Sequence, residues 1–194
     1  MMPRLALVAL PLAVMSAPAS ARDRDGFAGP YVGAAASLTQ HHFILEETGP
    51  SGTTSRNVSA WGPAGTVFAG LDFDLGSRFV AGVEGEFDFG GHTPRTTAAG
   101  GQVLAIKPRY GYGATAHLGV RAGASLLLYG KAGYGEHRYR TTLPAGAGNL
   151  HRNASFILGA GAEARVSRRL SVRLDLEHLD GSRNRVSIGI PLRF

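Results

Sequence analysis

The sequence contains no cysteine, so disulfides, thiolate-ligated metals and a cysteine-linked lipid anchor are excluded. Beyond the first 21 residues it has no apolar run of 18 residues, the length that a membrane-spanning helix needs. The chain carries 20 Lys and Arg against 14 Asp and Glu, but the bases form no run and are interleaved with acids. The basic composition therefore does not indicate a nucleic-acid-binding protein, and no nucleic-acid partner is expected.

The N-terminus has the pattern of an export signal. Arg4 gives a positive start, residues 5–15 form an apolar run, and Ala19-Ser20-Ala21 is a small-residue cleavage site. The apolar run is too short to cross a bilayer as a helix. We predict a signal peptide over residues 1–21 and one domain over residues 22–194. Removing the signal leaves a formal charge of 19 − 14 = +5.

Apolar and polar residues alternate along most of the chain. In residues 170–180, for example, Leu170, Val172, Leu174 and Leu176 fall on one face, and Ser171, Arg173, Asp175 and Glu177 on the other. The same alternation recurs at residues 31–39, 65–75, 79–89, 104–121, 126–140, 154–166 and 185–194. These eight strands offer more apolar face than one core can use. The sequence therefore predicts an all-β, eight-stranded, antiparallel, up-and-down transmembrane β-barrel with lipid outside and a polar interior.

The connections between these strands alternate in length. Those after the second, fourth and sixth segments are short, whereas those at residues 40–63, 90–102 and 141–153 are longer. Bacterial barrels have short periplasmic turns and longer outer loops, so the three long segments are predicted to face outward. The last outer connection, residues 181–184, is short.

Three stretches carry a resemblance to a known family. They are Gly29-Pro30-Tyr31-Val32-Gly33, the segment Leu127-Leu128-Tyr129-Gly130-Lys131-Ala132-Gly133-Tyr134-Gly135, and Leu158-Gly159-Ala160-Gly161-Ala162-Glu163 together with the terminal Arg193-Phe194. With the eight segments in place, the chain resembles the small outer-membrane β-barrel family that includes opacity-type proteins and the OmpA membrane domain. The resemblance implies a structural, adhesive or immune-facing surface protein of the bacterial outer membrane, and a few members of the family bind haem. It also implies that Phe194 is the signal read by the barrel-assembly machinery.

Strand parity assigns equal numbers of acids and bases to the interior. The acids are Asp72, Asp74, Glu84, Glu86, Asp88, Glu163, Asp175 and Glu177, and the bases are Lys107, Arg109, Arg121, Lys131, Arg165, Arg173, Arg185 and Arg193. The acidic third strand should lie beside the basic fourth, and His117 should be a hydrogen-bonded interior residue. Because the interior of an eight-stranded barrel is just wide enough for side chains, we predict a salt-bridged plug. Small inward Gly and Ser residues leave a narrow water path as the alternative.

Two kinds of chemical site were considered. His41, His42, His92, His137 and His151 fall in or near the predicted outer loops, where imidazoles could ligate a metal or haem iron, but their spacing matches no metal motif. Ser155 and Ser171 lie at strand ends, yet no His and acid pair is forced near either. The sequence therefore predicts no catalytic residue, no cofactor and no metal site.

The expected function is a non-enzymatic one at the cell surface. A structural or surface-interaction role, in envelope integrity, adhesion or host contact through the outer loops, fits the pattern best. The expected partners are outer-membrane lipids and lipopolysaccharide, the assembly machinery and host surface molecules. The alternatives are a surface protein that binds haem or a small ligand, a narrow channel, and a soluble lipocalin-type barrel with the opposite parity.

Overall fold

The computed structural model describes residues 26–49, 52–91, 93, 95–97, 103–142, 150–179 and 183–194. The predicted signal peptide, residues 1–21, lies outside the described residues. Within the described part of the chain, no helix is long and apolar enough to cross a membrane.

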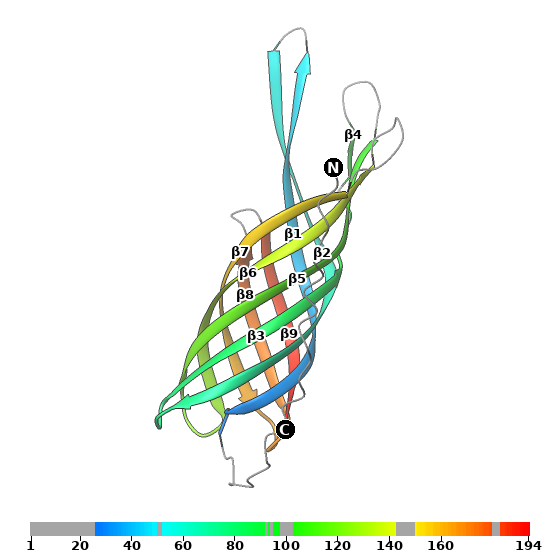
Figure 1. The fold of residues 1–194 in the computed structure, drawn as a ribbon. Coiled ribbons are helices and arrows are strands. Elements are labelled where there is room, and N and C mark those ends of the chain that lie inside the picture. Colours follow the sequence, from blue (N-terminus) through cyan, green and yellow to red (C-terminus); the bar gives the residue numbers. More distant parts are fainter. Residues whose placement is uncertain are drawn as a thin grey trace, which may run out of the picture.

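Eight strands close into a tilted antiparallel barrel (Figure 1). They are β1 (Gly29–Gly49), β2 (Gly52–Leu75), β3 (Phe79–Gly90), β5 (Val103–Arg121), β6 (Leu126–Thr142), β7 (Leu150–Arg165), β8 (Ser171–Leu179) and β9 (Arg183–Arg193). Pairing of β1 with β9 and of β3 with β5 closes the ring. The short β4 (Arg95–Thr97) stands outside the ring and pairs with the first residues of β5. The predicted eight-stranded antiparallel barrel is confirmed.

Burial alternates residue by residue, and the apolar set faces out. Leu174 and Ile188 are 49% and 57% exposed, whereas Arg173 and Glu84 are 6% and 4% exposed. In a soluble barrel these values would be reversed, because apolar side chains would fill the core. The alternation thus places the charged residues inside a closed wall whose outer surface is apolar.

The hairpin formed by β1 and β2 is much longer than the sequence indicated. Residues 40–63 were expected to be a loop, but β1 and β2 stay paired from Gln40↔Trp61 to Gly49↔Gly52. Pairing of β1 with β9 ends at Thr39↔Arg185, so the remainder of the hairpin projects alone beyond the barrel rim (Figure 1). The prediction was wrong because strand pairing in water does not require apolar alternation, the signal on which it relied. We call this end of the barrel the hairpin end.

A β-bulge interrupts the parity of β5. The register with β6 shifts between Pro108 and Tyr110, so Pro108 lies opposite Tyr139 and Lys107 lies opposite Arg140. A bulge adds one residue to one strand and reverses the faces of the residues before it. The assignment of Lys107 to the interior was therefore wrong, and its side chain is exposed.

Candidate functional site

Charged side chains span the middle of the lumen. Glu84 on β3 accepts two hydrogen bonds from Arg173 on β8, with Nη1–Oε2 at 2.5 Å and Nη2–Oε1 at 3.1 Å. These two strands stand on opposite sides of the ring, so the pair crosses the full width of the barrel. The Arg173 Nε also lies 2.8 Å from Asp175 Oδ2. The expectation that acidic β3 would lie beside basic β5 is met by the strand pairing. The arginines that pair with β3, however, lie across the lumen on β8 and β9.

Towards the hairpin end, a single guanidinium holds three carboxylates. The Arg185 Nη2 lies 2.9 Å from Glu86, its Nη1 lies 2.6 Å from Asp88, and its Nε contacts Glu177. Lys131 contacts the other oxygen of Glu177. All five side chains are buried, so each charge is neutralised by its neighbours rather than by water.

At the opposite end, Arg193 has the same linking role. It contacts Glu163, donates to Asp72 Oδ2 at 2.7 Å and donates to the carbonyl oxygen of Phe27 at 2.8 Å. The Phe27 ring is fully buried, with the guanidinium carbons of Arg165 and Arg193 at 5.4 and 5.6 Å from its centroid. The segment before β1 therefore closes this end of the lumen with an aromatic ring.

The buried charges come close to balance. Seven acids are buried, Asp72, Glu84, Glu86, Asp88, Glu163, Asp175 and Glu177, against five bases, Lys131, Arg173, Arg183, Arg185 and Arg193. The excess is 7 − 5 = 2 carboxylates. His117 lies 2.8 Å from Asp72 and His137 lies 3.2 Å from Asp88, so a histidine contacts one acid near each end.

The other predicted lumen residues lie at the rims. Asp74 and Arg121 contact each other at the end opposite the hairpin, and Arg165 binds the carbonyl oxygens of Gly26 and Ala124. Arg109 is exposed at the hairpin end. Lys107, as described above, lies on the outer face.

Several lumen residues were missed by sequence reasoning. Arg183 was assigned to a loop, yet it is 3% exposed and donates to Tyr139 and Ser155. Tyr31 and Tyr129 point inward and donate to Glu84 at 2.9 Å and Asp175 at 2.5 Å. The parity that placed Lys131 inside also places Tyr129 inside, so that signal was available.

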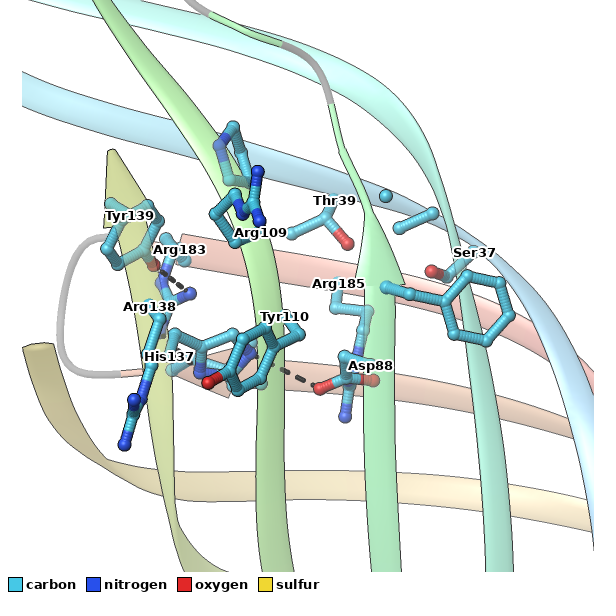
Figure 2. A pocket seen from close by; sticks show the side chains of 16 residues that line it. Ser37, Thr39, Asp88, Arg109, Tyr110, His137, Arg138, Tyr139, Arg183 and Arg185 are labelled. Carbon is cyan, nitrogen blue, oxygen red and sulfur yellow. Dashed lines mark hydrogen bonds and ion pairs between the residues drawn. The ribbon is translucent and has the colours of Figure 1, made fainter. Parts of the chain in front are cut away.

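A small polar pocket lies where the lumen opens at the hairpin end (Figure 2). Its empty space of about 430 Å³ is partly continuous with solvent. His137 and Asp88 form one ion pair in its wall, and Tyr139 and Arg183 form a hydrogen bond in another part (Figure 2). Below this pocket, Arg185 and its three carboxylates fill the lumen, so the pocket is a blind end in the part of the chain that the structure describes.

The four of the five candidate haem histidines whose backbone is described lie on three different strands. His137 lies in the lumen, whereas His41 and His42 belong to β1 and His151 to β7. His92 lies outside the described residues. No group of three or more His, Cys, Asp or Glu residues within the described ranges is arranged to hold a metal ion.

The two candidate serines are structural. The Ser155 hydroxyl accepts from Arg183 at 3.3 Å, and the Ser171 hydroxyl accepts from Arg193 at 3.3 Å. Both are buried, and among the described side chains neither hydroxyl is hydrogen-bonded to a histidine. A nucleophile needs an adjacent base, so neither serine is placed for covalent catalysis.

Inward glycines make room for side chains that cross the lumen. A Cβ at Gly161 would lie 2.4 Å from the Tyr129 ring and 2.7 Å from Asp175. A Cβ at Gly70 would lie equally close to the Tyr31 ring. Tyrosine rings therefore occupy the space beside Gly161 and Gly70, so these two glycines do not form the water path that a channel would need.

Replacing Gly161 with alanine is expected to destabilise the barrel by about 1–3 kcal/mol, because Tyr129 is fixed by its bond to Asp175 and cannot yield without strain. The measurement is urea unfolding in lipid vesicles. Gly130→Ala is the matched control, since a Cβ there faces outward and meets nothing closer than 3.9 Å. Equal stability of the two variants would show that the glycine pocket around Tyr129 is not tightly packed.

Comparison with known proteins shows which family has this architecture. The family model described as "Outer membrane protein beta-barrel domain" matches residues 7–190. The chain belongs to this family. It is thus a protein of the bacterial outer membrane, and the apolar outer wall of this outer-membrane barrel faces lipid. No curated protein matches the chain closely enough to count as a relative.

Solved structures align with this chain at low sequence identity, and NspA shows the same fold. Neisserial surface protein A (NspA) aligns with a TM-score of 0.55 and 15% identity over 86% of this chain and 97% of its own. The Yersinia pestis attachment invasion locus protein Ail, in complex with the heparin analogue sucrose octasulfate, aligns with a TM-score of 0.49 and 16% identity over 86% and 99%. The N-terminal barrel of Pseudomonas aeruginosa OprF gives 0.47 and 10% over 84% and 97%.

Proposed function

We propose that this outer-membrane barrel is a non-enzymatic surface-contact protein, in which a sealed barrel holds the β1–β2 hairpin away from the membrane. The observation that carries the proposal is the hairpin itself. Ten residues of β1, from Gln40 to Gly49, pair with β2 beyond the point where β1 leaves β9. At about 3.3 Å per residue, the hairpin extends roughly 33 Å past the rim.

The sealed lumen supports a contact role over transport. The pair between Glu84 and Arg173 crosses the barrel, and Arg185 fills the space above it. Moving an ion through would require separating buried charge pairs, which is costly in a low-dielectric interior. The described residues also bring together no nucleophile and base, so no covalent chemistry is assigned.

Host surface molecules are the proposed partners of the hairpin, and the assembly machinery is the proposed reader of Phe194. The Phe194 side chain is 67% exposed at the end of β9, and its backbone nitrogen donates to the Pro30 carbonyl oxygen at 3.1 Å. The terminal ring is thus accessible while the backbone that carries it is fixed in the barrel.

Shortening the hairpin tests the contact role. Replacing residues 42–59 with an Asn-Gly turn joins His41 to Ala60, which are partners in the hairpin register, and a two-residue turn suits this connection. When the shortened protein is expressed in a non-adherent bacterial strain, adherence to epithelial monolayers is expected to fall to the level of cells lacking the protein.

Two controls accompany this experiment. Heat-modifiable migration on gels should be unchanged, because the shortened segment lies outside the barrel wall. A second variant with residues 43–58 scrambled keeps the hairpin length and separates reach from sequence. Full adherence by the shortened, correctly folded protein would overturn the proposal.

A further inference from the structure

Basic side chains gather on the outer face of the barrel at the hairpin end of β5 and β6. The bulge turns Lys107 outward, directly opposite Arg140 on β6. Arg138, two residues before Arg140 on β6, also faces outward and lies opposite Tyr110. The register partner of Arg138 on β7 is Arg152. Figure 2 shows Arg138 and Tyr110 together beside β5 and β6. We call Lys107, Arg138 and Arg140 the outer ledge.

The ledge has more positive charge than its neighbours neutralise. Lys107 and Arg140 share a face at directly paired positions, an arrangement that is destabilising for like charges. Neither contacts a carboxylate among the described residues. Arg138 does have one such partner, since its Nε lies 3.2 Å from Glu136 Oε1. One acid against three bases leaves an excess that an external anion would neutralise.

Aromatic rings fix the depth of the ledge. The Arg138 guanidinium carbon lies 5.5 Å from the centroid of the Tyr110 ring, and Tyr110 stacks on Phe87 with centroids 5.9 Å apart. Outward aromatic rings near strand ends mark the headgroup level of an outer-membrane barrel. The ledge therefore lies at the depth of lipid phosphates, which Arg binds with short, charge-assisted hydrogen bonds.

A groove lies below the ledge on the same face. Its floor is formed by small outward residues on adjacent strands, Ala69, Gly85, Ala114, Ala116 and Ala132. Leu71 and Val83 border one side, and the other is bordered by Leu158 and by the rings of Tyr134 and Phe156, which meet edge to face at 5.5 Å. The groove is shallow and open, because these small side chains lie between larger apolar ones.

The groove lies at the depth of the acyl chains, measured from the ledge. From Tyr110 to Ala116 is six residues, or about 20 Å along the strand. On a strand tilted by about 45° this corresponds to about 14 Å of depth. The hydrocarbon of one leaflet is about 15 Å deep, half of the full core. The depth between the outer ledge and the far end of the groove therefore matches the depth between the phosphate and the end of an acyl chain in one lipid.

We propose that this face of the barrel binds one phosphorylated, multiply acylated lipid of the outer leaflet, with its phosphate on the outer ledge and an acyl chain in the groove. This is the chemistry of the lipid A part of lipopolysaccharide. The inference rests on the outer-membrane location and not on the contact role of the hairpin. Loss of adherence and loss of lipid binding are therefore separate results.

The test measures lipid A binding to the full mature barrel in detergent by native mass spectrometry. The ledge variant Lys107→Gln, Arg138→Gln, Arg140→Gln is expected to bind lipid A about tenfold more weakly, since three partly exposed ion pairs are removed. Arg78→Gln, Arg168→Gln, Arg169→Gln is the matched control, with the same charge change on exposed turns at the opposite end. Its affinity is expected to stay within twofold of the unmodified protein.

Other ligands distinguish the contribution of the phosphate from that of the acyl chain. Lipid A stripped of its phosphates should bind the unmodified protein as weakly as intact lipid A binds the ledge variant. Inorganic phosphate should not compete, because it lacks the acyl chain, and Ala132→Leu, which fills the groove, should also weaken lipid A binding. Equal affinity of the ledge variant and its control, or phosphatidylglycerol binding as tightly as lipid A, would overturn the proposal. Heat-modifiable migration verifies that each variant is folded.

Discussion

Replacing Arg185 with glutamine is expected to lower the free energy of unfolding of the barrel by about 3–5 kcal/mol, the usual cost of removing one partner from a buried ion pair. The large effect follows from geometry, because this guanidinium contacts Glu86, Asp88 and Glu177 at once. All three carboxylates would remain buried with less neutralising charge. The measurement is urea unfolding in lipid vesicles, followed by gel migration.

A second variant separates charge balance from lost packing. Adding Glu177→Gln to Arg185→Gln removes one of the three buried carboxylates and is expected to recover part of the loss. Lys131 then loses its closer carboxylate and keeps Asp175 at 3.7 Å. Arg168→Gln, on an exposed turn, is the control for loss of an arginine and is expected to stay within about 0.5 kcal/mol. A negligible effect of Arg185→Gln would mean that water, rather than the guanidinium, neutralises the three acids.

Replacing Leu174 with arginine is expected to destabilise the protein by about 2–4 kcal/mol, the cost of a base on the lipid face near the bilayer midplane. Leu174 lies in the middle of β8 opposite Ile188, and both side chains point away from the lumen. The effect is measured in vesicles, where the wall of the barrel is in contact with hydrocarbon.

The position of the substitution is the control. Val166→Arg introduces the same charge just beyond β7, on a residue that is 65% exposed, and is expected to cost about 0–1 kcal/mol because it lies near the interface. Equal tolerance of arginine at both positions would show that the Leu174 face is in water. That outcome would contradict the membrane placement of the barrel wall.

Within the barrel wall, strand parity was readable from the sequence because a strand has a period of two. Leu174 and Arg173 occupy opposite faces wherever β8 lies in the sheet. The failure at Lys107 has a local cause, the bulge between Pro108 and Tyr110. Proline in a strand is confined to edges and bulges, so Pro108 was an available warning.

The hairpin and Arg183 show what strand parity did not predict. Residues 40–49 lack the apolar alternation of a lipid-facing strand, and their strand structure depends on pairing with β2. Arg183 shares the parity of Arg185, but it was placed in a turn because the last strand was expected to begin at Arg185 rather than at Arg183. The projecting part of the hairpin has no apolar period because it lies beyond the lipid-facing wall.

The sequence by itself determined the number of strands, their parity and the membrane as their surroundings, since each follows from a local alternation repeated eight times. The tertiary structure decided which charges pair. Arg173 and Glu84 are 89 residues apart and meet only because the closed ring puts β8 opposite β3. The outer ledge and the groove below it likewise depend on the register of adjacent strands. A period of two determines only which face of the sheet a side chain occupies. Which side chains then meet depends on how the strands pair and close into a ring, so these contacts cannot be predicted from the alternation.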